Sequence, residues 1–370
     1  MKSIAYIAFA IVYYMACVLP VNKNRFFCVM THDSSEDSGV GVVIKEIKTR
    51  NPSAVFTYVT KEDRKITSLV KLIFVKSVML ATSRVVLMDN EFLPLAYVKR
   101  RKNVLIVQLW HGTGTIKKFG HDANEGSMLK RVTRADNKIT HLIVNSDYTK
   151  ELYKGAFGVT DEVVYVTGIP RTDTFFSEKV RETSVSSFYN EYPELKGRKL
   201  ILYAPTFRDN EVKNPRCMLD FDKWVKKMDE DVVLLIRLHP HVAVFYKEDT
   251  ISCYNGKVVN VSSYNDVNTL LFVSDALITD YSSIIFEYVV LDRPMYFYAY
   301  DFDTFADSGR GFYEEYTEYV PGKVVYTTEE LIAAIQDEDK YKDVRNEFAS
   351  HAYKYMDGCS TKRVVDLLDI

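Results

Sequence analysis

The chain has 370 residues, of which 47% are hydrophobic and 26% are charged, so it can bury two ordinary cores. Low glycine and proline counts, 15 and 10, argue against a disordered or fibrous protein. Five scattered cysteines without a C-x-x-C pair suit a reducing compartment and give no zinc signature. The net charge of −2 conceals an asymmetry, because residues 1–190 hold 27 Lys and Arg against 18 Asp and Glu. We therefore expect the first half to face something anionic.

The N-terminal segment from Ile4 to Leu19 is uncharged and strongly apolar, and Pro20 follows it. A helix of this length reaches roughly 24 Å, which is short of a hydrocarbon core of ~30 Å. We expect residues 1–20 to form an interfacial helix that docks the protein on a membrane. A buried first helix is the alternative, and a cleaved signal peptide fits the residues less well. The densest basic patch, Tyr97–Lys102, also suits an anionic surface.

Short runs of Val, Ile, Leu and Phe alternate with helical patterns such as Thr67–Thr82 and Glu329–Asp337, which is typical of parallel α/β sheets. The strands expected in the first half are Phe26–His32, Val55–Val59, Val85–Asp89, Val104–Leu109, Leu142–Ser146 and Val163–Thr167. Those expected in the second half are Leu200–Ala204, Val232–Leu238, Val258–Val261, Ala276–Thr279 and Met295–Tyr298.

The polar segment Ser177–Gly197 interrupts this alternation, so we place the domain boundary there. An N-terminal, membrane- and acceptor-facing domain would cover residues 21–185, and a C-terminal donor-binding domain residues 186–370. The predicted fold class is α/β and GT-B-like, with two Rossmann-like parallel-sheet domains facing a central cleft. In such sheets ligands bind beyond the carboxyl ends of the strands, where the polar motifs of this sequence fall.

In the first motif an expected strand delivers His111 into a glycine-rich turn followed by lysines. Histidine suits general-base work near neutral pH, and glycines let backbone N–H groups approach an anion. We expect His111 to be catalytic, with a hydrogen-bonded structural histidine as the alternative. The expected phosphate loop consists of Gly112, Thr113, Gly114, Lys117 and Lys118.

A second apolar strand ends on His239, and Pro240 fixes the turn after it. His239 is expected to donate a hydrogen bond to a phosphate oxygen, whereas His241 is typical of a surface residue. In a third motif, Ser282 and Ser283 begin a helix and offer hydroxyls and N–H groups to a diphosphate.

Glu287 lies about one helical turn further on, within reach of a ribose hydroxyl; a plain helix cap and an exposed glutamate are the alternative. Arg208 offers a planar fork for phosphate, and Arg310 is a second candidate; either is otherwise a surface ion-pair partner. Dinucleotide, P-loop, hydrolase-elbow and zincin motifs are absent, as are carboxylate clusters for two metals. We therefore expect neither a metal nor a cofactor.

Taken together and in order, W-H-G-T, Y-A-P-T-F-R-D, R-L-H-P and T-D-Y-S-S-x-x-F-E resemble the CDP-glycerol glycerophosphotransferase family of wall teichoic acid synthesis. The resemblance runs from about Val85 to the C-terminus. It implies a GT-B fold, a CDP-alditol donor and a membrane-associated, undecaprenyl-diphosphate-linked acceptor. The run Gly114–Gly120, G-x-x-K-K-F-G, is similar to the short primase type, whereas polymerases have W-H-G-T-P-L-K.

The resemblance places the two essential histidines of the family at His111 and His239. The full donor-binding set that we expect is Thr206, Arg208, Thr279, Asp280, Ser282, Ser283, Glu287 and Arg310. The expected partners are CDP-glycerol or CDP-ribitol, a lipid-diphosphate-linked glycan and a membrane surface, without nucleic acid.

The expected function is transfer of glycerol phosphate from CDP-glycerol to an undecaprenyl-diphosphate-linked disaccharide at the cytoplasmic membrane face, releasing CMP. The alternatives are a glycerol- or ribitol-phosphate polymerase, a CMP-sialic acid-dependent sialyltransferase, and a membrane- or glycolipid-binding member without turnover. Glu36–Gly39 approaches the acidic motif of such sialyltransferases, but Ser38 breaks it. The Trp110–Gly112 turn favours phosphotransfer instead.

Overall fold

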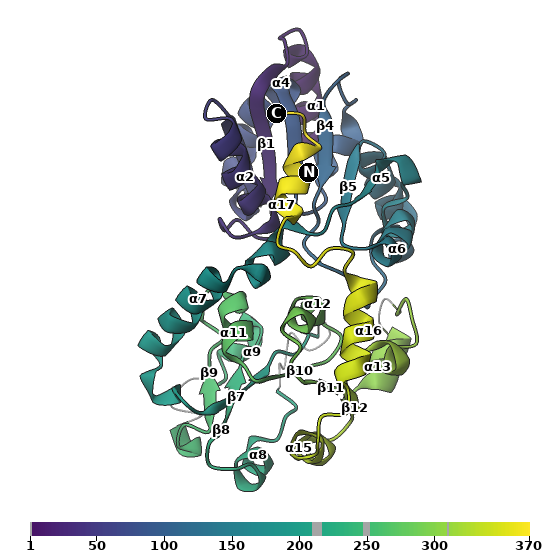
Figure 1. Cartoon of the computed structure of the whole chain (residues 1–370). Coiled ribbons are helices and arrows are strands. Elements are labelled where there is room, and N and C mark those ends of the chain that lie inside the picture. Colours follow the sequence, from purple (N-terminus) through teal and green to yellow (C-terminus); the bar gives the residue numbers. More distant parts are fainter. Residues whose placement is uncertain (1, 209–216, 247–251, 309–310) are drawn as a thin grey trace. The chain divides into compact units, whose positions relative to one another are not determined.

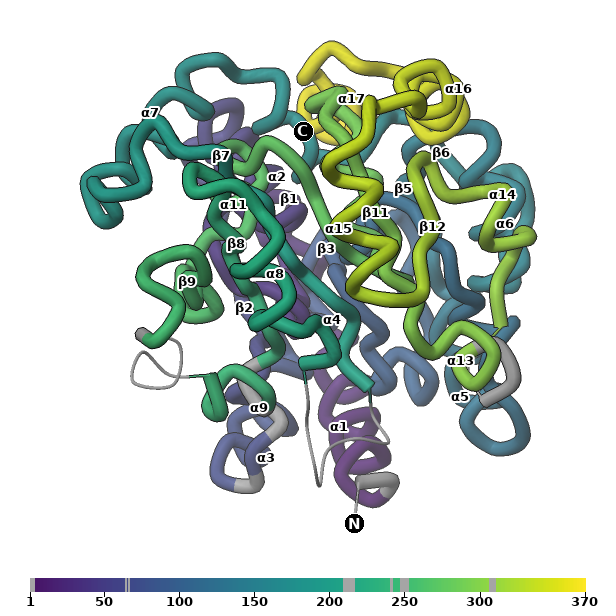
Figure 2. Tube along the Cα trace, turned by 90° about the horizontal axis from the view of Figure 1, so that it is seen from below, coloured from purple at the N-terminus to yellow at the C-terminus, as the bar shows by residue number. Residues whose placement is uncertain are grey.

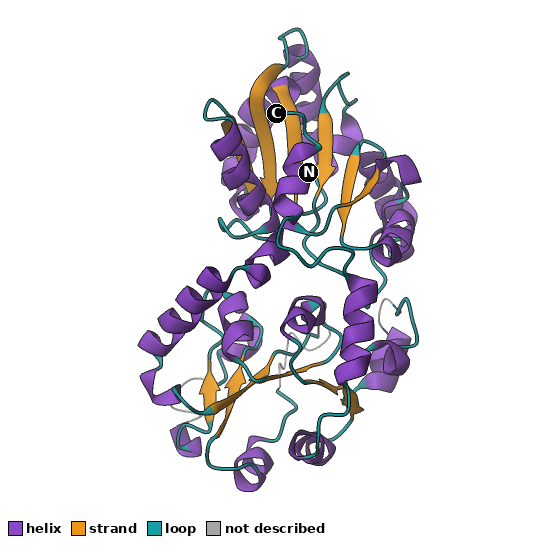
Figure 3. Ribbon diagram, in the orientation of Figure 1, coloured by secondary structure: helices purple, strands orange, loops and turns teal. Residues whose placement is uncertain are grey.

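A computed structural model describes residues 2–208, 217–246, 252–308 and 311–370, which form two compact units. Unit 1 comprises Met1–Gly114, Lys118–Phe176 and His351–Ile370, and unit 2 comprises Thr115–Lys117 and Ser177–Ser350. Each unit is built on a six-stranded parallel sheet with flanking helices (Figures 1 and 3). This is the α/β architecture that the alternating strand and helix patterns predict.

The sheet of unit 1 has the strand order β2-β1-β3-β4-β5-β6. Its strands are β1 (Asn22–Met30), β2 (Val55–Thr60), β3 (Ser83–Met88), β4 (Leu105–Gln108), β5 (His141–Val144) and β6 (Val164–Val166). Its helices are α1 (Lys2–Ala16), α2 (Gly39–Arg50), α3 (Leu69–Lys71), α4 (Ser77–Thr82), α5 (Gly126–Asp136), α6 (Asp147–Phe157) and α17 (Ser360–Asp366). Because β2 lies on one side of β1 and β3 on the other, the topological switch point is at the carboxyl ends of β1 and β3.

The sheet of unit 2 has the order β12-β11-β10-β7-β8-β9, so its switch point lies between β7 and β10. Its strands are β7 (Lys199–Tyr203), β8 (Val232–Ile236), β9 (Val258–Asn260), β10 (Ala276–Thr279), β11 (Met295–Tyr298) and β12 (Lys323–Val325). Its helices are α7 (Glu178–Glu191), α8 (Phe221–Lys227), α9 (Pro240–Ala243), α11 (Val267–Val273), α12 (Ile284–Tyr288), α13 (Phe302–Ser308), α14 (Tyr316–Tyr319), α15 (Thr328–Gln336) and α16 (Lys342–Ala352), the last two residues of which lie in unit 1.

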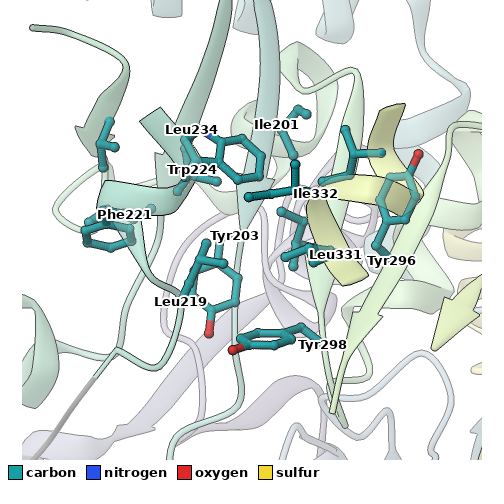
Figure 4. Close-up of a cluster of buried hydrophobic side chains, with 14 of the residues drawn as sticks. Ile201, Tyr203, Leu219, Phe221, Trp224, Leu234, Tyr296, Tyr298, Leu331 and Ile332 are labelled. Atoms are coloured by element: carbon teal, nitrogen blue, oxygen red, sulfur yellow. The ribbon is translucent and has the colours of Figure 1, made fainter. Parts of the chain in front are cut away.

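One hydrophobic cluster of unit 2 joins its sheet to the helices α8 and α15. Trp224 of α8 is fully buried, and Leu331 and Ile332 of α15 belong to the same cluster as Ile201 and Leu234 from the sheet (Figure 4). Helix α15 runs alongside β11 and β12 (Figure 2). A Thr327–Glu330 capping box begins α15, which explains the sharp start of this helix.

All of the strands expected from the sequence are present, and the start of β1 differs most from its expected position. The sequence missed β12, because three residues are too few to show a periodic pattern. The helix expected over Thr67–Thr82 is broken into α3, the π-helical turn η3 (Leu72–Lys76) and α4. Within the described ranges, every helix is too short or too polar to cross a bilayer.

The division between the units differs from the expected boundary at residues 185 and 186. Helix α7 belongs entirely to unit 2, whereas residues from His351 onward return to unit 1. The return has two physical causes. The carboxylate of Asp173 accepts hydrogen bonds from the backbone N–H groups of Ser360 and Thr361, at 3.0 and 2.7 Å. Apolar side chains of α17, including Val364, also lie in the core of unit 1. Helix α17 itself packs against α2, and both are labelled in Figure 1.

Candidate functional site

Unit 1 places His111 just beyond the carboxyl end of β4. Trp110 before it has a φ of 57°, a left-handed conformation that is rare for a large side chain. The Trp110 N–H donates to the side-chain oxygen of Gln108 at 3.0 Å, and the two rings of Trp110 and His111 lie 4.1 Å apart. This strained turn directs the His111 ring toward the end of β3.

The Nδ1 atom of His111 lies 2.9 Å from the backbone carbonyl oxygen of Asp89. Because a carbonyl oxygen only accepts hydrogen bonds, Nδ1 carries the proton and the neutral ring keeps a lone pair on Nε2. Burial lowers the pKa of His111 to about 4; nearby His32 and Arg171 act in the same direction, and the hydrogen bond to Asp89 opposes them. The ring is therefore neutral near pH 7, as a general base must be.

Asp89 is buried at the switch point of unit 1, directly after β3. Its carboxylate accepts hydrogen bonds from three successive backbone N–H groups, those of Thr31, His32 and Asp33, at 2.9 to 3.1 Å. Burial raises the pKa of this carboxyl group, and these hydrogen bonds oppose the rise. Asp89 thus fixes the loop after β1 with its side chain and the ring of His111 with its main chain.

Two further residues complete what we call the His111 site, which consists of His32, Asp89, His111 and Arg171. The ring of His32 lies parallel to that of His111, with centroids 4.1 Å apart and planes 9° apart. The guanidinium of Arg171 donates a hydrogen bond of 2.7 Å to the backbone oxygen of His111. The sequence analysis identified His111 as a member of this site, but it did not identify the other three residues.

The expected phosphate loop follows His111. Thr113 is fully buried, and the hydroxyl of Tyr153 donates to the backbone oxygen of Gly112 at 3.2 Å. Lys117 lies in unit 2, where its ammonium group is 5.7 Å from the ring centroid of Phe305 and its backbone bridges to Phe312. Gly114 is buried, and Lys118 is half-buried. Lys117 thus belongs to unit 2, whereas the other four residues of the expected loop belong to unit 1.

Unit 2 brings together the loops after β7 and β10, at its own switch point. The carboxylate of Asp280 accepts hydrogen bonds from the backbone N–H groups of Thr206 and Tyr281, at 2.8 and 2.7 Å. The hydroxyl of Thr279 donates to the backbone oxygen of Ala204 at 2.7 Å. Thr279 and Asp280 therefore hold the two loops against each other.

Arg208 is buried between these loops and is held by two carboxylates. Its guanidinium donates to Asp280 at 2.8 Å and twice to Asp301, at 2.7 and 2.9 Å. A further N–H donates to the backbone oxygen of Thr206 at 2.6 Å. The fork of Arg208 is thus paired with two carboxylates within unit 2, an arrangement that the sequence did not predict.

Beside this network lies a small pocket whose lining residues are Tyr203, Pro205, Thr206, Phe207, Arg208, Leu238, His239, Val242 and Tyr300. The exposed ring of His239 stacks on Phe207, with centroids 4.1 Å apart. The hydroxyl oxygen of Thr206 is buried and has no hydrogen-bond partner among the described residues. An unpaired buried hydroxyl costs free energy, so a polar ligand in this pocket would be stabilised by pairing with it.

The serines of the third motif lie at the start of α12. The Ser282 hydroxyl accepts a long hydrogen bond of 3.3 Å from the backbone of Ile284, and the Ser283 side chain makes no capping hydrogen bond. Glu287 is buried, so the alternative of an exposed glutamate is wrong. Arg310 lies outside the described residues. In the part of the chain that is described, no three His, Cys, Asp or Glu side chains are placed to hold a metal ion.

The sequence missed His32, Asp89, Arg171 and Asp301. A signal existed for two of them, because His32 and Asp89 end the expected strands Phe26–His32 and Val85–Asp89 and so fall where ligands bind to parallel sheets. Asp301 follows β11 by three residues and carries a weaker form of the same signal. Arg171 lies in the 3₁₀ helix η7 (Pro170–Phe176), and no sequence pattern marked it as a functional residue.

The fold and the site define a GT-B-like protein with polar residues at both switch points. The family model of the CDP-glycerol:poly(glycerophosphate) glycerophosphotransferases matches residues 11–369, and the chain belongs to this family. The GT-B-like fold and the family expected from the four motifs are thereby confirmed.

Two curated relatives and one solved structure show how far the likeness extends. The teichoic acid poly(ribitol-phosphate) polymerase of Bacillus spizizenii is 34% identical over 362 residues, which are 94% of this chain and 56% of the relative. The teichoic acid ribitol-phosphate primase of the same organism is 33% identical over 300 residues, 78% of this chain and 75% of the relative. The wall teichoic acid polymerase TagF has the same fold, with a TM-score of 0.81 and 24% identity over 97% of this chain and 92% of that one. This chain spans about half the length of the curated relatives that it matches first.

Proposed function

We propose that this protein transfers glycerol phosphate from CDP-glycerol to a hydroxyl group of an undecaprenyl-diphosphate-linked disaccharide and releases CMP. The observation that carries the proposal is the His111 site, in which the Asp89 carbonyl fixes the tautomer that leaves Nε2 able to accept a proton. Membership of the glycerophosphotransferase family supports the choice of donor.

In the proposed reaction, the acceptor hydroxyl oxygen attacks the β-phosphorus of the donor in line. The new phosphorus–oxygen bond forms as the bond to the bridging oxygen breaks, and CMP leaves with that electron pair. Nε2 of His111 takes the hydroxyl proton. Most of the rate enhancement would come from positioning and charge stabilisation, with a general base worth roughly 10²–10⁴-fold.

In this proposal, unit 2 binds the donor. The pocket beside β7 offers the unpaired hydroxyl of Thr206 and the exposed ring of His239 to the diphosphate. Ser282 and Ser283 add hydroxyls at the same switch point, from the loop after β10, and Glu287 is assigned to the ribose. Arg208 lines the same pocket and also stabilises these loops through its two carboxylate partners.

We also infer that unit 1 docks on the cytoplasmic face of the membrane through α1. One side of α1 packs against α4 and the neighbouring turns, as the alternative of a buried helix requires. The opposite side exposes a stripe spaced by three or four residues, Ile4, Ile7, Ile11 and Met15, which the exposed Val18 continues in the turn after the helix. We call this stripe the α1 stripe.

Basic residues contact α1 and the turn that follows it. The hydroxyl of Tyr13 donates to the backbone oxygen of Lys99 at 2.8 Å, and the guanidinium of Arg101 donates to the backbone oxygen of Leu19 at 2.8 Å. The apolar segment and the basic patch 97–102, which are far apart in the sequence, are thus joined. A helix with an exposed apolar stripe and a basic patch packed against it suits docking on an anionic membrane surface.

Ribitol phosphate is the second candidate for the transferred group, because the two relatives described above act on ribitol phosphate by name. The fold does not separate the two alditols, since both attach through the same CDP group. The polymerase alternative shares this support, because one of these relatives is a polymerase.

The test is an assay of purified protein with CDP-glycerol, CDP-ribitol or CMP-sialic acid and a synthetic lipid-diphosphate disaccharide. CMP release and the mass of the lipid product are followed together. One added glycerol phosphate supports the proposal, several units indicate a polymerase, and turnover of only CDP-ribitol or CMP-sialic acid overturns the donor. His111→Ala should abolish turnover. His141→Phe serves as its control, because His141 begins β5 and stacks on Tyr165 at 4.5 Å.

A further inference from the structure

The closest ring neighbour of His111 outside its own turn is His32, a residue to which neither the motifs nor the proposed reaction give a role. The two imidazoles are nearly parallel, 9° apart in plane and 4.1 Å between centroids. They come from different strands, because His32 follows β1 and His111 follows β4. Two separate loops thus meet face to face at the switch point of unit 1.

Asp89 fixes the backbone at His32 and the ring of His111. Its carboxylate accepts the backbone N–H of His32 at 3.1 Å, and its backbone oxygen accepts Nδ1–H of His111 at 2.9 Å. Rotation of the His111 ring about its Cβ–Cγ bond would break the second hydrogen bond. A flat ring at 4.1 Å also obstructs that rotation, so stacking and hydrogen bonding favour the same orientation of Nε2.

The charges around the pair disfavour protonation of either ring. Arg171 and Lys61 contribute positive potential at His32, and Asp33 alone opposes them there. At His111, the neighbouring His32 and Arg171 add to the effect of burial, and the carbonyl of Asp89 opposes it. Because two stacked imidazolium ions would repel each other strongly, at most one ring holds a second proton.

We propose that His32 is a positioning residue for the base, holding the plane of His111 and keeping its Nε2 free of a proton. The proposal rests on the function proposed above and deepens it by adding a second histidine to the same site. His32 acts through its ring face and its charge, and it takes no proton from the acceptor. Substitutions at His32 can test the effect of its ring face apart from the effect of its charge.

Two variants make this separation. His32→Phe keeps a flat ring on His111 but removes the titratable nitrogens, whereas His32→Ala removes both. We expect His32→Ala to lower kcat on the order of 10- to 100-fold with a smaller change in KM, because the base loses its orientation. His32→Phe should stay within about threefold of wild type, since it preserves the stacking.

The decisive measurement is a titration of His111 by NMR, with ¹³C-labelled histidine and assignment by the His111→Ala variant. Both His32 variants should shift the titration of His111 to higher pH, because the two rings no longer compete for the single extra proton that the pair can hold. This readout needs no substrate, so it remains informative if the proposed donor does not react.

An unshifted His111 titration in both variants, or wild-type kcat in His32→Ala, would overturn the proposal. If His32→Ala does not fold, His32→Phe still supplies the titration. His141→Phe controls for the loss of an imidazole elsewhere in unit 1, since His141 begins β5 and stacks on Tyr165, and it should leave the titration unchanged.

Discussion

Asp301 accepts two hydrogen bonds from Arg208, of 2.7 and 2.9 Å, and these connect the loop after β11 to the loop after β7. The rings of Tyr281 and Phe305 also cover the guanidinium, at 5.0 and 4.9 Å from its centre. Such a buried, bidentate ion pair is costly to break, because the partner left behind keeps a buried charge. The pair is therefore expected to set the shape of the pocket at the end of β7.

Asp301→Asn should raise the KM for the CDP-linked donor on the order of tenfold and should change kcat less, because the donor loops lose their support. It should also lower the free energy of unfolding by about 1–3 kcal/mol, since Asp280 remains as a second partner of Arg208. Steady-state kinetics and urea denaturation measure the two effects. Asp303→Asn is the control, because Asp303 is exposed on α13; an equal effect of both variants would contradict this role.

The depressed pKa of His111 predicts that the protein loses stability in mild acid. The folded value is about 4, whereas an unfolded histidine titrates near 6.5, so the unfolded state binds more protons between these values. Stability is therefore lost as the pH falls from ~6.5 toward ~4, and this residue should account for about 2 kcal/mol between pH 7 and pH 5.

Urea denaturation at pH 7 and pH 5 tests this dependence. His111→Gln, which does not titrate, should flatten it, and His351→Gln at an exposed position of α16 should not. A pH dependence that is equally steep in His111→Gln and in wild type would show that other groups cause the acid loss.

Gly120 ends the G-x-x-K-K-F-G run and has a φ of 57°. A Cβ atom built there would lie only 2.0 Å from the backbone oxygen of Ala156 in α6. Gly120→Ala should therefore lower the free energy of unfolding by about 2–4 kcal/mol, since it combines left-handed strain with a backbone clash. Thermal unfolding followed by circular dichroism measures the change.

Gly126 supplies the matched control for this variant. Its φ is 59°, but no other atom lies within 4 Å of the position that a Cβ atom would take there. Gly126→Ala should cost only the conformational strain, about 1 kcal/mol. Equal losses at both glycines would mean that the close approach to α6 contributes nothing.

Membrane docking predicts that two charges on the α1 stripe abolish binding to vesicles. Ile7 and Ile11 are 51% and 57% exposed, so Ile7→Glu with Ile11→Glu should fold normally. The double variant should bind anionic phospholipid vesicles at least tenfold more weakly, because each apolar side chain contributes about 1.5–3 kcal/mol on burial. Sedimentation with vesicles measures the partition.

Val180 and Val344, both 40% exposed in unit 2, provide the control for the added charge. Val180→Glu with Val344→Glu should leave vesicle binding unchanged. Unaltered binding of the α1 variant, or equal weakening in both double variants, would count against docking through α1.

The sequence was a good guide to the sheets, because buried parallel strands show as unbroken apolar runs whatever their neighbours are. It was a poorer guide to contacts between distant residues. His111 was found from its turn, but the partners His32 and Asp89 depend on the strand order β1-β3-β4, which a single sequence does not reveal. For the same reason the ion pair of Arg208 with Asp301 was not predicted, since Asp301 lies 93 residues further along the chain.

The return of the last residues to unit 1 bears on the order in which the chain folds during synthesis. Val364, Val365 and Leu368 are fully buried in the core of unit 1, so that core is incomplete until these residues have left the ribosome. Residues 177–350 of unit 2 emerge earlier and lack only the segment 115–117, which has emerged before them. Domains usually complete their folding in the order of their synthesis, starting with the N-terminal one. Here all residues of unit 2 have been synthesised before α17, so unit 2 can complete its core before unit 1 does.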